Sequence, residues 1–296
     1  MISYPSDTAF RQALEQRLLN QARAEPTIPL VRLRKAVAFE ALLRRLLRDH
    51  PDEWLVKGGF ALQLRLGLQT RTTKDIDLRA AGSIDQAERH VRDAAQRELG
   101  DVFTFEVGTS TTELMGAPGG GRRIPARAIL ASRRFEEFHV DLGCGDPIVG
   151  AVQLATGNPI LEALGYPAIA VPLYPLATTV AEKVHAYTIP RLTGNMRVRD
   201  LVDLALMMER CDFAAQEVRR ACGETFRTRA AHVWPPQFEA PPSSWDKPYQ
   251  RLRDETGIHP RTAGAAHQEL VAFLAPVLGE VSAQWDSESH AWQYDQ

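Results

Sequence analysis

Two short motifs near the start of the chain limit the folds that it can adopt. The first, residues 57–62 (KGGFAL), follows apolar residues and opens a segment with helical spacing. The second, residues 73–78 (TKDIDL), spaces two carboxylates so that both point to one side of an extended strand. Glycines at a helix start expose backbone amides to phosphate, and paired carboxylates can share a divalent cation. The order predicts a strand, a turn, a helix and then an acidic strand.

Each motif alone also has an ordinary structural role. A glycine pair often forms a turn because glycine tolerates positive φ, and an Asp-x-Asp pair often lies solvated on an edge strand. Here the apolar residues 54–56 precede the glycines, and Ala61, Leu62, Leu64 and Leu66 follow them with side chains for burial. This combination favours the two halves of a nucleotidyl-transfer site.

The two motifs resemble those of the AbiEii/MenT toxin branch of the DNA polymerase β-like nucleotidyltransferases. Three later segments also resemble that family: a strand-like segment with Asp141, a helix-like segment with Lys183, and residues 197–204 (RVRDLVDL), which contain Asp200. The resemblance covers about residues 54–210 and depends on the order of all these segments. It implies an α+β (α/β) fold, in which a polymerase β-like nucleotidyltransferase core with a mixed sheet precedes a helical C-terminal half.

The resemblance implies a role for the carboxylates and glycines of these motifs. Asp75 and Asp77 are expected to bind Mg²⁺, and Asp141 is expected to be a general base or a further metal ligand. The backbone amides of Gly58 and Gly59 are expected to contact the β- and γ-phosphates of a nucleoside triphosphate. Carboxylates that hold Mg²⁺ help to neutralise phosphate oxygens and to deprotonate or orient an attacking hydroxyl.

Three further residues have both a functional and a structural interpretation. Thr73 and Lys57 could bind phosphate, although a strand threonine often packs and a strand-end lysine is often solvated. The resemblance gives Lys183 a catalytic role. If Thr179 and Glu182 form a capping box, Lys183 lies in the first helical turn, where the helix dipole disfavours a cation and an anionic partner is expected. An earlier helix start would remove that argument.

Asp200 and Asp203 are three residues apart and share one face of the expected helix. The resemblance implies that Asp200 completes the catalytic site by orienting Lys183. A salt-bridge cluster with Arg197 and Arg199 that anchors two helices is the structural alternative.

Some polar residues near the motifs are interpreted as structural. His139 and His185 are expected to pack or to form hydrogen bonds, because a lone histidine on an apolar face seldom binds metal. Asp146, beside Gly145 and Pro147, is expected in a turn.

The composition is that of a chain that folds without covalent crosslinks. Its 296 residues, 44% of them hydrophobic, can form one large domain or two ordinary ones. We expect an N-terminal helical layer over residues 1–50, a nucleotidyltransferase core over residues 51–170 and a mostly helical domain over residues 171–296. The three cysteines are odd in number and lack metal-site spacing, which indicates a reducing compartment.

The chain is expected to be cytoplasmic. Its first residues lack the charged start and apolar core of a signal peptide, and no apolar run approaches the length of a membrane span. No membrane partner is therefore predicted.

Hydrophobic periodicity predicts the remaining elements. Helices are expected at residues 7–20, 30–49, 84–99, 176–189, 198–210, 212–222 and 264–279. Strands are expected at residues 102–107, 126–131 and 135–142, as a meander that ends on Asp141. Residues 232–260 contain many prolines and tryptophans, so no long regular element is expected there. They form either a loop that closes over a substrate or an irregular connection, and residues 284–296 fit no single pattern.

The charge pattern allows contact with a nucleic acid only at particular places. A net charge of −2 argues against indiscriminate binding, which needs a broad positive surface. Two basic clusters could follow an RNA backbone, although each arginine could equally be paired with an acidic neighbour on a solvated face. The clusters are Arg32, Arg34, Lys35, Arg44, Arg45 and Arg48, and then Arg122, Arg123, Arg127, Arg133 and Arg134.

The resemblance implies that the chain is the toxin of a toxin–antitoxin pair. Toxins of that family can add nucleotides to the 3′ end of tRNA, which blocks aminoacylation and arrests growth, and an antitoxin is encoded alongside. We therefore expect a Mg²⁺-dependent nucleotidyltransferase whose partners are an NTP, tRNA and a cognate antitoxin.

Two other functions are compatible with the same motifs. A small-molecule nucleotidyltransferase of the antibiotic-modifying type would need an acidic pocket for a cationic acceptor. A noncatalytic nucleotide-binding regulator would tolerate the loss of a metal-binding carboxylate, and the presence of both Asp75 and Asp77 argues against it.

Overall fold

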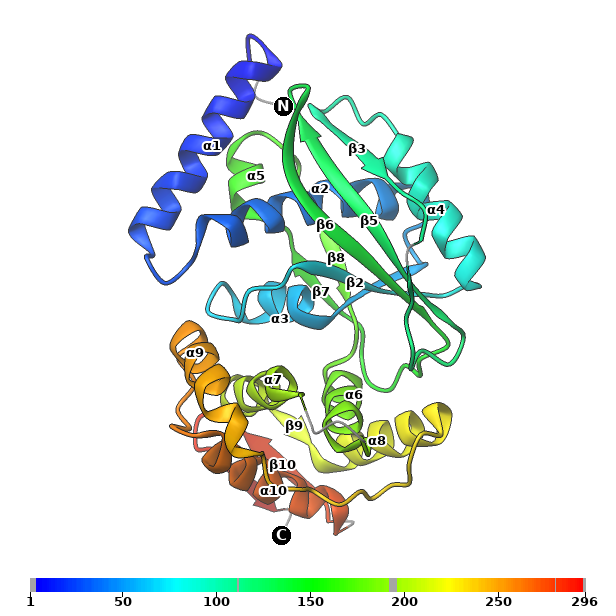
Figure 1. Cartoon of the computed structure of the whole chain (residues 1–296), viewed down its shortest axis with the longest axis vertical. Helices are drawn as coiled ribbons and strands as arrows, with labels where there is room; N and C mark the ends of the chain where they lie inside the picture. Colours follow the sequence, from blue (N-terminus) through cyan, green and yellow to red (C-terminus); the bar gives the residue numbers. More distant parts are fainter. Residues whose placement is uncertain (1–3, 111, 192–195, 280, 295–296) are drawn as a thin grey trace. The chain divides into compact units, whose positions relative to one another are not determined.

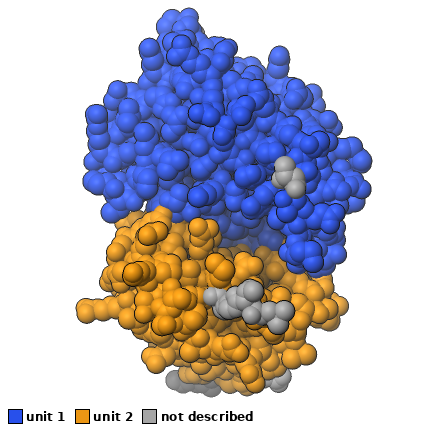
Figure 2. All heavy atoms as spheres, viewed as in Figure 1, with its two compact units in different colours: residues 1–68, 72–145, 153–174 blue, residues 69–71, 146–152, 175–296 orange. Residues whose placement is uncertain are grey.

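A computed structural model describes residues 4–110, 112–191, 196–279 and 281–294. The chain forms two compact units, which Figure 2 shows in different colours. Unit 1 comprises Met1–Leu68, Thr72–Gly145 and Gln153–Tyr174, and unit 2 comprises Gln69–Arg71, Asp146–Val152 and Pro175–Gln296. Each unit is described below by itself.

Unit 1 is built on a mixed β-sheet (Figure 1). In the described part of the chain, eight strands form this sheet in the order β3-β5-β6-β2-β1-β8-β7, with β4 paired to β5. The pairs β2–β6 and β1–β8 are parallel and the others are antiparallel, so the expected mixed sheet is confirmed. The strands are β1 (Trp54–Lys57), β2 (Asp75–Ala80), β3 (Phe103–Val107), β4 (Thr112–Glu113), β5 (Gly121–Leu130), β6 (Arg133–Cys144), β7 (Gln153–Thr156) and β8 (Ala170–Leu173).

The expected meander is present as β3, β5 and β6, and the strand with Asp141 lies next to the strand with Asp75 and Asp77. Strands β7 and β8 lie in a segment for which the sequence pattern predicted no element. Each of these strands has only four residues, and most residues of β7 are exposed. Their sequences therefore show little hydrophobic periodicity.

The helices of unit 1 share its apolar core with the strands of the sheet. They are α1 (Asp7–Ala24), α2 (Leu30–Asp49), α3 (Gly58–Leu66), α4 (Ile84–Gln96) and α5 (Pro159–Ala163). Helix α2 packs against β6 and α4, and its Phe39 ring contacts the rings of Phe60 and Phe138 edge-on at centroid distances of 5.1 and 5.0 Å. Ser83 caps α4 by accepting a hydrogen bond from the amide of Gln86, as the capping pattern predicts.

The basic side chains of α2 are engaged within unit 1. Arg45 is 1% exposed and forms an ion pair of 2.6 Å with Asp101, while Arg44 pairs with Glu40 at 2.6 Å. Arg32 is also buried and donates a hydrogen bond to the carbonyl of Leu68. The prediction that this cluster could follow an RNA backbone is therefore wrong for these side chains, because burying a guanidinium requires partners close at hand.

Unit 2 is mostly helical, as expected, and also contains a small sheet. Its helices are α6 (Leu176–Thr188), α7 (Val198–Arg210), α8 (Ala215–Arg229), the 3-10 turn η1 (Ser243–Trp245), α9 (Asp246–Thr256) and α10 (Ala263–Leu278). Among the described residues, three short strands form a sheet in the order β11-β10-β9: β9 (Phe213–Ala214), β10 (Ala283–Asp286) and β11 (Ala291–Tyr294).

One expectation for unit 2 is corrected, and a segment that fitted no single pattern is now assigned. Helix α9 lies inside the proline- and tryptophan-rich segment, and it tolerates Pro248 because that residue is in its first turn, where an N–H has no intrahelical acceptor. The C-terminal tail, whose residues 295–296 lie outside the described residues, forms the β10–β11 hairpin. Its Trp285 and Trp292 contact the ring of Phe273, so long-range packing decides the structure of this segment.

The three cysteines, Cys144, Cys211 and Cys222, are buried and are not joined in disulfide bonds. None of the described helices is both long and apolar enough to cross a membrane.

We predict that Asp101→Ala lowers the free energy of unfolding by about 3 kcal/mol, because it leaves the Arg45 guanidinium buried without its carboxylate. Urea unfolding followed by circular dichroism measures this change. Arg48→Ala, which removes an exposed arginine of the same helix, is the control and should change the value by less than about 0.5 kcal/mol. Equal small effects of both variants would contradict the structural role of Arg45.

Candidate active site

Three carboxylates lie on the neighbouring strands β2 and β6. Along β2 the exposure alternates, so Asp75 and Asp77 lie on the partly exposed face, while Ile76 and Leu78 are buried on the other face. The parallel pairing places Asp77 directly beside Asp141. The sequence-predicted carboxylates therefore lie on adjacent strands of one sheet.

Arg123 on β5 binds this carboxylate cluster. Its Nε and Nη2 atoms donate to the two oxygens of Asp141 at 2.8 and 2.6 Å, and Nη2 lies 3.2 Å from Oδ2 of Asp75. The hydrogen bonds to Asp141 outweigh partial burial and raise the pKa of Arg123, and the charges of Asp141, Asp75 and Asp77 add to the effect. Asp141 and Asp75 thus contact one guanidinium, and Asp77 acts on it through its charge.

Gly58 brings the start of α3 against the acidic strand. Strand β1 ends at Lys57, which pairs in register with Asp77, and α3 begins at Gly58 with a φ of +63°. A Cβ at Gly58 would lie 2.0 Å from Oδ2 of Asp77, so no larger residue fits without displacing that carboxylate. Both the left-handed backbone and the close approach therefore require glycine. Gly59 is buried in the first turn of the same helix.

The other predicted phosphate-binding residues of unit 1 have local contacts. The Thr73 hydroxyl donates to the carbonyl of Asp75 at 2.9 Å, which orients the chain as it enters β2. The ammonium group of Lys57 lies 4.6 Å from the centroid of the Tyr174 ring, within the range of a cation–π contact. His139, next to Asp75 in register, has its Nδ1 3.1 Å from Oδ1 of that carboxylate.

A cavity of about 990 Å³ opens beside Asp75 and Arg123. Its volume is at the upper end of the range for small-molecule and cofactor sites. It is lined by Lys35, Lys74, Asp75, Gln96, Phe105, Glu106, Val107, Gly108, Arg123, Pro125, Ala126, Arg127, Glu137, Phe138 and His139. Arg127 forms ion pairs with Glu106 and Glu137 at 2.8 and 2.9 Å, so part of this basic lining is already paired.

In unit 2, Lys183 of α6 is the centre of a buried ionic cluster. Its Nζ lies 2.5 Å from Oδ2 of Asp203 and 3.3 Å from Oδ1 of Asp200, both on α7. Arg71 also binds both oxygens of Asp203 at 2.9 Å. Burial alone would lower the pKa of Lys183, but Asp203 and Asp200 outweigh it and raise that pKa. The lysine is therefore held in its charged form.

The capping-box argument for Lys183 is wrong. Helix α6 begins at Leu176, with Pro175 at its N-cap, and the Thr179 hydroxyl donates to the Pro175 carbonyl at 3.0 Å. Lys183 therefore lies beyond the first turn, and the dipole gives no argument for an anion there. The positive charge of Lys183 is balanced instead by Asp203 and Asp200.

Three residues of these clusters were not assigned to a site from the sequence. Arg123 was identified only as part of a basic cluster, and its alternation with apolar residues on β5 is the signal that places it on the carboxylate face. Asp203 was considered with Asp200, but it is the more deeply buried of the two. Arg71 lies in no recognisable motif, so only the tertiary structure reveals its contact with Asp203.

Two solved structures were compared with this chain. MenT4, a nucleotidyltransferase toxin from Mycobacterium tuberculosis, matches with a TM-score of 0.57 and 20% identity over 89% of this chain and 98% of that chain. JHP933 from Helicobacter pylori matches with a TM-score of 0.40 and 13% identity over 83% of this chain and 97% of that chain. No curated protein sequence is similar enough to this chain to count as a relative. The fold is that of a nucleotidyltransferase.

The sequence family gives a closer assignment. The model of the nucleotidyl transferase AbiEii toxin family, of type IV toxin–antitoxin systems, matches residues 40–290. The chain belongs to this family and is a nucleotidyltransferase toxin. The family, the fold and the enzyme class expected from the sequence are thus confirmed.

We predict that Gly58→Ala lowers the free energy of unfolding by about 2–4 kcal/mol, because the new Cβ needs a left-handed backbone and also meets Asp77. Gly100→Ala is the matched control. Gly100 has a φ of +69° in the same unit, but no atom lies within 4 Å of the place that its new methyl group would take, so only the backbone cost of about 1–2 kcal/mol applies. If chemical denaturation showed the same decrease in the free energy of unfolding for both variants, the contact of the new Cβ with Asp77 would have no measurable cost.

We predict that His185 makes the protein less stable in acid. Burial, together with the charges of Arg229 and His232, lowers the pKa of His185 to about 4, below its usual value near 6.5. The unfolded chain therefore gains a proton first, so the stabilisation is present above pH 6.5 and is lost as the pH falls toward 4. In His185→Leu, the loss of unfolding free energy between pH 7 and pH 4 should shrink by about 2 kcal/mol.

Proposed function

We propose that this toxin is a Mg²⁺-dependent enzyme that transfers a nucleoside monophosphate from an NTP to the 3′ end of tRNA in the cytoplasm. The observation that carries this proposal is the meeting of Asp75, Asp77 and Asp141 on adjacent strands beside the glycine start of α3, with the Arg123 guanidinium bound to Asp141 and Asp75. A divalent ion held by these carboxylates would compete with that guanidinium.

The residues present fit Mg²⁺. The cluster offers carboxylate oxygens, which Mg²⁺ prefers, and no sulfur donor. Asp75, Asp77 and Asp141 would hold the ion, and the Arg123 guanidinium would have to leave Asp141 to make room for it. When bound, the ion would neutralise phosphate oxygens and polarise the phosphorus centre.

The protein residues would supply orientation and charge. The amides at the start of α3, beside Asp77, would bind phosphate oxygens, and Gly58 allows the closest approach of the backbone. Arg123, once released from Asp141, would pair with the triphosphate through its planar donors. Asp141 or the adjacent His139 would take the proton of the attacking hydroxyl. Lys183 and Asp200 keep the catalytic roles that the family pattern implies, as predictions.

The lining of the cavity is not the acidic pocket that a small cationic acceptor would need. Its charged side chains are Lys35, Lys74, Arg123 and Arg127 beside Asp75, Glu106 and Glu137. Membership of a toxin–antitoxin family supports a cognate antitoxin as the further partner.

The test is incubation of the purified protein with Mg²⁺, each α-³²P-labelled NTP in turn and total tRNA. We expect label on tRNA with the wild type and at least a roughly 100-fold lower rate with Asp75→Ala/Asp77→Ala. Asp85→Ala/Asp93→Ala, which removes two exposed carboxylates of α4, is the charge-matched control and should keep the wild-type rate.

The acceptor position is tested with periodate-oxidised tRNA, which lacks the 3′-terminal diol and should remain unlabelled. Label on oxidised tRNA would exclude the 3′ end as the acceptor. Metal-dependent NTP binding without labelled RNA would favour a small-molecule acceptor. Failure to bind any NTP would contradict the proposal.

A further inference from the structure

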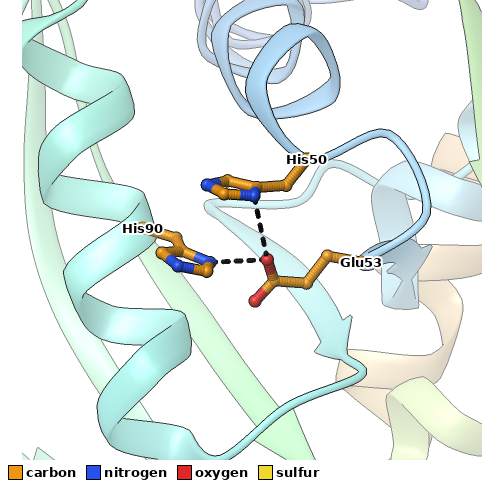
Figure 3. A group of neighbouring side chains, drawn as sticks. All are labelled: His50, Glu53 and His90. Carbon is orange, nitrogen blue, oxygen red and sulfur yellow. Dashed lines mark hydrogen bonds and ion pairs between the residues drawn. The ribbon is translucent and has the colours of Figure 1, made fainter.

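We propose that His50, Glu53 and His90 form a binding site for a divalent transition-metal ion, of which Zn²⁺ is the best candidate (Figure 3). Their ligand atoms all lie within 4.8 Å of one another. The Nδ1 atom of His90 is 2.5 Å from Oε2 of Glu53, and the Nδ1 atom of His50 is 3.8 Å from the same oxygen. Among the described residues, these are the three histidine, cysteine or acidic side chains whose ligand atoms meet within that distance.

Three separate elements of unit 1 position these side chains. His50 is the C-cap of α2, and the amide of Glu53 donates to its carbonyl across a short turn. The carbonyl of Glu53 accepts a hydrogen bond from Ala81, just after β2, at 3.0 Å. His90 lies on α4, which packs against α2. The ligands are therefore held by the backbone of the core and not by a free loop.

The Glu53 carboxylate has an unused binding capacity. Its side chain is only 10% exposed, and its Oε1 atom is buried without a hydrogen-bond partner in the described part of the chain. On folding, such an oxygen loses its hydrogen bonds to water and gains none in return, which reduces the free energy of unfolding. A metal ion bound by the carboxylate would provide the missing interaction.

The donor set favours a transition metal. Two imidazole nitrogens and one carboxylate oxygen match a common zinc ligand set, with a water molecule at the fourth position. Mg²⁺ prefers oxygen ligands, so the ion proposed for Asp75, Asp77 and Asp141 would not favour this cluster. The two sites should therefore differ in the metal that they select.

The geometry also shows what must move when the ion binds. The rings of His50 and His90 are stacked, with centroids 3.8 Å apart and planes 9° from parallel. Parallel rings cannot both aim an in-plane lone pair at one ion, so one ring must turn. The His50 side chain is 37% exposed and His90 is 18% exposed, so His50 is the ring with room to turn. A cavity of about 500 Å³, lined in part by His50 and Glu53, provides that room and a path for the ion.

The site lies at the opposite end of β1 from the candidate active site. Glu53 immediately precedes β1, whose first residue pairs with Ala80 and whose last residue, Lys57, pairs with Asp77. Four strand residues at about 3.3 Å each separate the two ends. An ion at this position would not touch the phosphates, and its effect would be to clamp α2, β1 and α4 together.

The test is equilibrium dialysis of metal-stripped full-length protein against Zn²⁺, with the bound metal measured by mass spectrometry. We expect one tight equivalent in the wild type and at least roughly tenfold weaker binding in His90→Ala and Glu53→Gln. His50→Asn alters the most exposed ligand and tests the site without disturbing the core. His259→Ala, at an exposed histidine of unit 2, should bind like the wild type.

Two further readouts distinguish this site from metal binding elsewhere on the protein. Bound Co²⁺ should show visible ligand-field absorption in the wild type that is absent in His50→Asn. Zn²⁺ should raise the melting temperature of the wild type but not that of His50→Asn. Equal Zn²⁺ binding by the wild type and His50→Asn would overturn the proposal. Loss of the tight equivalent in Asp75→Ala/Asp77→Ala, with binding kept in Glu53→Gln, would also overturn it by assigning the ion to the other cluster.

Discussion

The parallel pairing of β2 with β6 is the interaction on which the candidate active site depends. It brings Asp77 beside Asp141 although the two are far apart in sequence, and it places His139 beside Asp75. Carboxylates this close repel one another, and the Arg123 guanidinium, contributed by β5, offsets that repulsion. Under the proposed function, a divalent ion held by these carboxylates would compete with the Arg123 guanidinium for the same oxygens.

Unit 2 also contains a cluster of opposite charges, and this cluster is buried. Lys183 and Asp203 are almost completely buried, and Arg71 gives the Asp203 carboxylate a second positive partner. Removing one member of such a cluster leaves a buried charge uncompensated, so these residues are strongly coupled. A catalytic role for Lys183 and a structural role in joining α6 to α7 are therefore compatible, and loss of activity in a Lys183 variant needs a stability measurement beside it.

Local sequence patterns predicted those elements whose structure is decided within one short segment of the chain. The glycine start of α3, the acidic strand β2, the meander and the Ser83 cap of α4 were all evident from residue type and spacing. The predictions were wrong where distant partners decide the outcome. Arg44 and Arg45 of α2 pair with Glu40 and Asp101 within the core, and α9 forms in spite of the prolines around it. For the final residues the pattern gave no prediction, and they pair as a hairpin whose tryptophans contact Phe273.

The sequence alone determined which chemical groups are available, because the alternation in residues 73–78 sets the direction of the carboxylates and glycine alone fits the backbone at position 58. Tertiary structure decided which groups meet. Arg123, Arg71 and the His50, Glu53 and His90 cluster each join segments that are distant along the chain. No local pattern contains such a pairing, since it depends on strand register and helix packing, and these are set by burial of the whole core.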